Sequence, residues 1–155
     1  MGEFSLSSYA ASSENRTRGR TIVTDSHGDL VVYRLEKARQ TLEDARVLAS
    51  AGRWNACVNR LYYACFYAIS ALLLRDGLSA TKHTGVRSLF NRHYVKTGMV
   101  PKRMARIYND LFERRQESDY TDFTDFQESQ VAPWISEAEK FVEHIVKVTN
   151  TEKGG

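Results

Sequence analysis

The chain has 155 residues, of which 42% are hydrophobic and 26% charged, and its formal net charge is +3. This length is typical of a single domain and is enough to bury a core without metals or disulfides. No apolar run approaches the roughly 20 residues of a membrane span, and residues 1–20 hold no continuous apolar segment like that of a secretory signal. We therefore expect one cytoplasmic domain that does not contact a membrane.

The two cysteines, Cys57 and Cys65, fall in the same predicted helix. Their separation along the helix axis would be about 12 Å, whereas a disulfide needs Cα atoms within roughly 7 Å. Both are surrounded by apolar residues, where a reduced cysteine acts as a small hydrophobe. This arrangement suits a reducing cytoplasm.

Hydrophobic periodicity predicts five helices and no strand. Residues 1–28 are polar, show no sustained period, and are predicted to form a flexible tail. Apolar residues recur at helical spacing through the rest of the chain, and Gly52, Gly77 and Pro101 mark helix ends or starts. The expected helices span about 30–51, 54–75, 84–97, 101–118 and 129–148, with a loop at 119–127.

The second of these helices, from Trp54 to Arg75, is apolar nearly all round. Such a helix belongs at the centre of a bundle or at a subunit interface. The short connections favour an up-and-down antiparallel bundle of four to five helices over residues 29–150, followed by a disordered C-terminus at 151–155. One face of the second helix is left for homodimerisation.

Charge is unevenly distributed along the chain. Between Lys82 and Arg106 there are seven basic residues and no acidic one, whereas Asp119 to Glu143 holds seven acids and one lysine. A segment of one sign attracts opposite charge, such as phosphate. Two structural explanations stay open: a solvated helix face, or basic and acidic helices that pair with each other.

Arg115 is the most informative residue, because it continues the apolar stripe of the fourth helix, where an arginine is costly unless paired. Asp119 follows four residues later, which is the spacing of a helical ion pair. One interpretation is a structural Arg115–Asp119 pair that fixes the helix end. The other is a guanidinium positioned for phosphate.

Arg60 interrupts the apolar second helix, and Tyr63 and Tyr67 lie on its face. A core network with these tyrosine hydroxyls and a carboxylate from another helix would satisfy it. The alternative is a polar cleft lined by Arg60, Tyr63 and Arg115. His83 opens the third helix, where it could bind an anion or serve as a plain capping residue.

Several site types are absent from the sequence. It has no HExxH, no CxxC pair, no Gly-rich phosphate loop, and no metal-ligand spacing among its four histidines. We expect no metal and no cofactor.

Three motifs, in order along the chain, resemble those of the HEPN domain family. They are the string Asn59-Arg60-Leu61-Tyr62-Tyr63-Ala64-Cys65-Phe66-Tyr67-Ala68, His83 at the next helix start, and Arg115-Gln116-Glu117-Ser118-Asp119-Tyr120. The chain looks in particular like the short prokaryotic proteins labelled UPF0332, over about residues 32–148. This resemblance implies an antiparallel bundle that dimerises, and a toxin–antitoxin or defence system in which a minimal nucleotidyltransferase is the partner.

Catalytic members of that family are metal-independent RNases with an Arg-x(4–6)-His motif. The resemblance implies that the arginine holds phosphate and the histidine transfers protons while the RNA 2′-OH attacks. This sequence keeps the arginine as Arg115, but Asp119 and Tyr120 stand where the histidine would be. A carboxylate beside an arginine is ionised and a poor acid at neutral pH. Arg87 and His93 satisfy the spacing on the third helix, which is not the family's position, so we treat that match as chance.

A tyrosine near this motif is a nucleotidylation target in related toxins, which makes Tyr120 the candidate here. Three functional hypotheses follow. The first is a non-catalytic module that binds nucleotide, RNA or a nucleotidyltransferase through Arg60, Tyr63, His83, Arg87, Arg115 and Asp119. The second is an RNase that uses Arg115 with His83 or Tyr120. The third is a purely structural oligomerisation bundle.

Overall fold

The computed structural model describes residues 22–120 and 125–151, with side chains described for 26–117 and 125–151. All regular structure in these ranges is helical, as predicted, and no strand occurs there. The elements are α2 (Ile22–Ser50), α3 (Trp54–Arg75), α4 (His83–Phe90), the π-helical turn η1 (Asn91–Val95), α5 (Lys102–Tyr120) and α6 (Glu128–Asn150).

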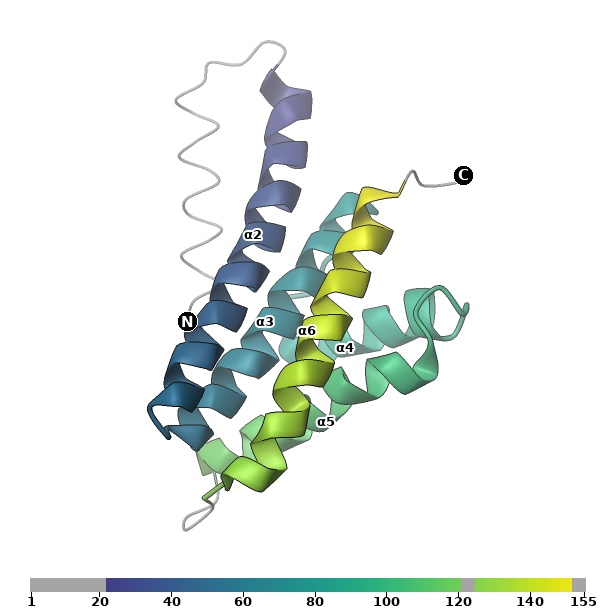
Figure 1. Cartoon of the computed structure of the whole chain (residues 1–155). Coiled ribbons are helices and arrows are strands. Elements are labelled where there is room, and N and C mark those ends of the chain that lie inside the picture. Colours follow the sequence, from purple (N-terminus) through teal and green to yellow (C-terminus); the bar gives the residue numbers. More distant parts are fainter. Residues whose placement is uncertain (1–21, 121–124, 152–155) are drawn as a thin grey trace.

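The helices alternate in direction around a central member (Figure 1). In that view α2 and α5 descend while α3 and α6 ascend, which confirms the all-α, up-and-down bundle. Helix α3 packs against α2, α4, α5 and α6. The short α4–η1 segment and α5 cross the other helices at an angle, on the side of the molecule away from α2.

Helix α3 forms the centre of the core. Thirteen of its 22 residues are buried, among them Leu61, Tyr62, Ile69 and Leu72, as its nearly continuous apolar surface predicted. Although polar residues interrupt its apolar sequence, α3 is long and apolar enough, by length and composition, to cross a membrane. However, 72% of the apolar stretch is buried among the other helices, which is the position of a core helix.

Two helix boundaries differ clearly from the prediction. Helix α2 begins at Ile22, so residues 22–28 belong to a helix and not to the tail. Its first turns extend beyond the neighbouring helices (Figure 1) and need no apolar stripe, which explains why periodicity missed them. Helix α5 continues to Tyr120, past the predicted loop start. The rest of the predicted tail and residues 152–155 lie outside the described ranges.

The two cysteines are fully buried, and both are free thiols. Burial raises the pKa of the Cys57 thiol to about 11, so the thiol stays protonated at neutral pH. Both residues therefore behave as core hydrophobes, as predicted.

Arg75 joins the ends of three elements. Its guanidinium donates to the carbonyl oxygens of Val148 (2.6 Å) and Thr149 (3.2 Å) at the end of α6, and it forms an ion pair with Asp76 at 2.8 Å. The Tyr94 hydroxyl of η1 donates to the same Asp76 carboxylate. Cations at helix C-termini satisfy the last carbonyl groups, so Arg75 fixes α6 and η1 against the end of α3.

The acid-rich helix α6 pairs with α2. Arg39 contacts Glu143 at 3.0 Å, and Arg46 contacts Glu139. The proposed pairing of the acidic helix with the basic segment 82–106 does not occur among these contacts. Most of the positive charge of that segment is therefore left to face solvent.

Candidate functional site

Two adjacent tyrosines of α3 form the base of the candidate site. Tyr62 is fully buried, and its ring stacks on that of Tyr108 with centroids 5.9 Å apart. The half-buried Tyr63 meets Tyr62 edge-on at 5.1 Å. Burial raises the pKa of Tyr62, against a smaller opposing effect of the Arg115 cation, so its hydroxyl keeps its proton.

Arg115 approaches this pair from α5. Its guanidinium carbon lies 4.7 Å from the centre of the Tyr62 ring and 5.7 Å from that of Tyr63. Both distances are within the range of cation–π attraction. The arginine that continued an apolar stripe is half-buried, and its cation rests against aromatic rings. The side chain of Asp119 lies outside the described residues, so its predicted ion pair with Arg115 stays a prediction.

His83 reaches the same tyrosine from the first position of α4. Its Nδ1 shares a 2.9 Å hydrogen bond with the Tyr62 hydroxyl, and its ring stacks on Phe66 at 4.4 Å. A tyrosine hydroxyl can donate or accept, so it can hold the imidazole in either tautomer. His83 is thus held by α3 and is more than an exposed capping residue.

Arg60 occupies the outer side of the site. Its guanidinium lies 5.1 Å from the Tyr63 ring centre and donates to Asn59 Oδ1 at 2.9 and 3.2 Å. We had expected a carboxylate from another helix to pair with Arg60. Among the described residues no such ion pair forms, so this expectation was wrong. Arg60 is only half-buried, so it does not require one.

The structure therefore brings four of the predicted residues together around one unpredicted residue, Tyr62. We call Arg60, Tyr62, Tyr63, His83 and Arg115 the Tyr62 cluster. Sequence reasoning had assigned Tyr62 to the core because it fits the apolar pattern of α3. Its hydroxyl and its place between an arginine and a histidine were not visible in that pattern.

Arg87 lies beside the cluster. Its guanidinium is 3.9 Å from the centre of the Phe112 ring and 3.3 Å from Glu113 Oε2. Phe112 in turn meets Tyr62 at 6.0 Å between ring centroids. Arg87 is thus one aromatic ring away from the cluster.

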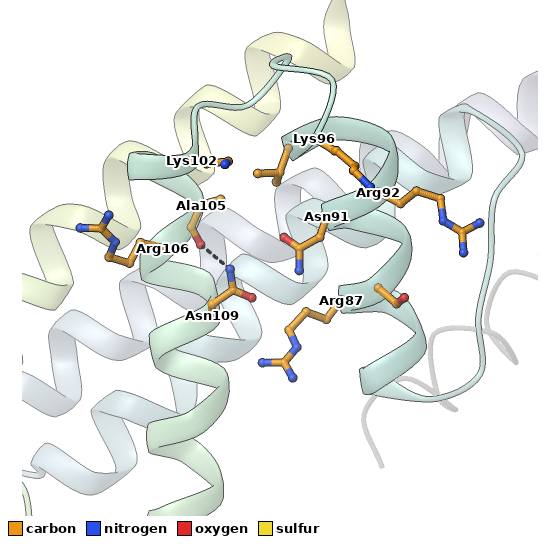
Figure 2. A pocket seen from close by; sticks show the side chains of 10 residues that line it. Arg87, Asn91, Arg92, Lys96, Lys102, Ala105, Arg106 and Asn109 are labelled. Carbon is orange, nitrogen blue, oxygen red and sulfur yellow. Dashed lines mark hydrogen bonds between the residues drawn. The ribbon is translucent and has the colours of Figure 1, made fainter.

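A groove of about 820 Å³ opens next to Arg87, between α4–η1 and α5. Figure 2 shows the two helical segments on either side of the hollow, with Asn91 and Asn109 between them. We call it the basic groove, and its charged lining residues are Arg87, Arg92, Lys96, Lys102 and Arg106. His93, the partner of Arg87 in the chance motif, is exposed on η1 and does not line the groove.

The remaining predicted residues are Asp119 and Tyr120. Their backbone belongs to the last turn of α5, but their side chains lie outside the described part of the chain. Among the described residues, no three His, Cys, Asp or Glu side chains gather in a way that could hold a metal ion.

Comparison with known proteins agrees with this arrangement. The HEPN domain model matches residues 31–149. A "UPF0332 protein" of Thermotoga maritima is 45% identical over 119 residues, which cover 77% of this chain and 90% of that protein. The protein of Methanocaldococcus jannaschii named "Putative toxin MJ0605" is 35% identical over 114 residues, covering 73% and 84%. A second protein of that organism, "Putative toxin MJ0142", is 33% identical over 86 residues, covering 56% and 58%.

The match covers every helix that contributes to the Tyr62 cluster, and the structure has the expected all-α architecture. The chain therefore belongs to the HEPN domain family, on its prokaryotic UPF0332-like branch.

Proposed function

We propose that this protein is a toxin-like module that binds RNA phosphate at the Tyr62 cluster. The observation that carries the proposal is the convergence of Arg115 and His83 on Tyr62, at 4.7 Å and 2.9 Å. A planar guanidinium carries its N–H donors in a fork that matches the geometry of phosphate oxygens. Membership of the HEPN family and the two relatives named as toxins support the same assignment.

Aromatic rings add a second means of holding nucleic acid. Tyr63 is half-buried, and the guanidinium carbons of Arg60 and Arg115 lie 5.1 and 5.7 Å from its ring centre. Base–aromatic stacking contributes about 1–3 kcal/mol per base in single-strand binding sites. A nucleotide at the cluster would therefore meet cations for its phosphate and a ring edge or face for its base.

The binding experiment compares two backbones. A fluorescent 12-nucleotide RNA and a peptide nucleic acid of the same base sequence are titrated with the protein at several salt concentrations. The proposal expects RNA affinity that falls steeply with salt, and no comparable binding of the uncharged oligomer. Equal affinity for both oligomers, or binding of neither, would contradict phosphate recognition.

A metal-independent RNase is the second candidate, favoured by the contact of His83 with the same tyrosine as Arg115. The histidine would accept the 2′-OH proton as O2′ attacks phosphorus, and would then return it to the departing 5′-oxygen, which leaves a 2′,3′-cyclic phosphate and a 5′-hydroxyl. Arg115 would stabilise the phosphorane charge. Histidine is the side chain that most often carries out proton transfer of this kind in catalysis.

If this candidate is correct, His83→Gln should lower the rate at which a total RNA pool is cleaved by about 100-fold or more, with a metal chelator present. Binding should persist, because the amide retains the polar contact with Tyr62. Gel electrophoresis of the RNA, beside a reaction with wild-type protein, measures the cleavage. His93→Gln, on the exposed face of η1, is the matched control. Cleavage that survives in His83→Gln, or an RNA pool that stays intact with wild-type protein, would remove the RNase assignment.

We further propose that the protein forms a homodimer and works with a minimal nucleotidyltransferase that modifies Tyr120. The support is the family membership together with the position of Tyr120 in the last turn of α5, five residues after Arg115. Intact mass after incubation with the cognate transferase and ATP tests the modification. An unchanged mass, or an added nucleotide that persists in Tyr120→Phe, would count against Tyr120.

A further inference from the structure

The basic groove has a different chemical character from the Tyr62 cluster. Five cationic side chains from α4, η1, the following turn and α5 line it, and no carboxylate does. Among the described residues no aromatic ring lines it either, so it lacks the aromatic stacking surface that Tyr63 offers at the cluster. A ligand that fits this lining carries several negative charges along its length.

Four of the five groove cations have no carboxylate partner in the described part of the chain, whereas Arg87 pairs with Glu113 at 3.3 Å. Within residues 26–117 and 125–151, none of Arg92, Lys96, Lys102 and Arg106 forms an ion pair with a carboxylate. All four are exposed. The arginines of α2 behave differently, because Arg39 and Arg46 each pair with a glutamate of α6.

Arg87 connects the groove to the cluster. It lines the groove, and its guanidinium also lies over Phe112, which contacts Tyr62. A strand with one nucleotide at the cluster can therefore continue past Arg87 into the groove. Figure 2 places Arg87 at one end of the hollow, with Lys96 and Lys102 toward the other.

We propose that the basic groove binds the sugar–phosphate backbone of a single-stranded RNA that extends from the Tyr62 cluster. This inference rests on the proposed function and adds a second, sequence-independent contact region to it. Phosphate contacts of this kind position the strand and do not read its sequence. Asn91 and Asn109 place amide groups between the two rows of cations, where phosphate oxygens can accept hydrogen bonds and ribose hydroxyls can donate or accept them.

The test uses two double variants of equal charge. Arg92→Gln/Lys96→Gln removes two groove cations, and Arg103→Gln/Lys140→Gln removes two exposed cations that do not line the groove. Each is titrated with a 12-nucleotide RNA and with a trinucleotide, at several salt concentrations. Thermal melts verify that both variants fold as the wild type does.

For the groove variant we expect about tenfold weaker binding of the 12-mer and a salt slope reduced by about 1.4, since each single-strand phosphate contact contributes about 0.7. The trinucleotide, which makes fewer phosphate contacts, should lose clearly less affinity than the 12-mer in the groove variant. The control variant, Arg103→Gln/Lys140→Gln, should bind both RNAs with nearly the affinity of the wild-type protein.

Equal effects of the two double variants on the 12-mer would overturn the proposal, and so would an unchanged salt slope in the groove variant. Arg115→Ala separates this result from failure of the cluster. Weak 12-mer binding in Arg115→Ala with normal binding in the groove variant would leave the cluster standing and overturn the proposal for the groove. The reverse pattern would retain the groove as the RNA site and overturn the role of the cluster.

Discussion

Replacing Arg115 with alanine is expected to weaken RNA binding by about 10- to 100-fold, because hydrogen bonds to charged groups contribute about 1.5–3 kcal/mol. The Arg115 guanidinium carbon lies 4.7 Å from the centre of the Tyr62 ring, and it is the cation at the centre of the proposed phosphate site. Fluorescence anisotropy with a labelled RNA measures the change. Arg115→Lys should restore only part of the affinity, because a lysine cannot offer the planar pair of donors.

Arg114 supplies the matched control for this experiment. It precedes Arg115 on α5, is 45% exposed, and forms an ion pair with Glu117 at 3.2 Å on the helix surface. Arg114→Ala removes the same charge from almost the same place in the sequence, so it should bind RNA nearly as wild type does. If both variants lose the same affinity, the loss reflects net charge and not the cluster.

The purely structural hypothesis makes a different prediction for Arg115→Ala. An arginine that only fixes the end of α5 would cost stability when removed, and there would be no RNA binding to lose. Denaturant unfolding beside the anisotropy titration therefore distinguishes the two roles. A destabilised variant of a protein that binds no RNA would establish the structural one.

Phe141→Ala should lower the free energy of unfolding by about 3–5 kcal/mol, the range for removal of a buried phenylalanine. Phe141 is fully buried in α6, and its ring contacts Tyr108 of α5 at 6.2 Å and Phe90 of α4 at 5.8 Å. The substitution leaves a cavity at the junction of three helices. Urea titration followed by circular dichroism measures the change.

Phe141→Leu is the companion variant, since it keeps most of the volume and should cost clearly less. Because Phe90 and Tyr108 belong to the elements that flank the basic groove, the alanine variant should also weaken RNA binding at temperatures where it is still folded. A loss of less than 1 kcal/mol in Phe141→Ala would show that this junction is not packed as described.

The helices could be predicted from sequence because each buries one apolar face, and burial imposes a period of 3.6 residues. The method failed where burial does not act. The first turns of α2 extend past the bundle, so the sequence has no apolar periodicity there from which a helix could be predicted. The π-helical turn at Asn91–Val95 was also missed, because it continues α4 without a break in apolar residues such as Phe90 and Tyr94.

The candidate site could be predicted in part for a related reason. Arg60 and Arg115 break apolar stripes, so the sequence itself marks them as requiring an explanation. Tyr62 fits its stripe, and nothing in the spacing indicates that its hydroxyl meets His83 or that its ring meets Arg115. Such contacts join helices far apart in the chain, and periodicity describes only one helix at a time.

The same limit applies to the basic groove. The run of cations between Lys82 and Arg106 was evident, but a charge run is compatible with a dispersed, solvated face. Only the packing of α4–η1 beside α5 brings Arg92 and Lys102 to the same hollow.

The most direct test of the central claim is NMR of the arginine Nε–Hε and histidine ring signals as a 2′-O-methyl RNA, which cannot be cleaved by 2′-OH attack, is added. If RNA phosphate binds at the Tyr62 cluster, the signals of Arg115 and His83 should shift together and saturate at the same RNA concentration. The Arg39 and Arg46 signals, on the opposite side of the bundle, should stay in place. Shifts confined to other arginines, with Arg115 and His83 unchanged, would contradict the account.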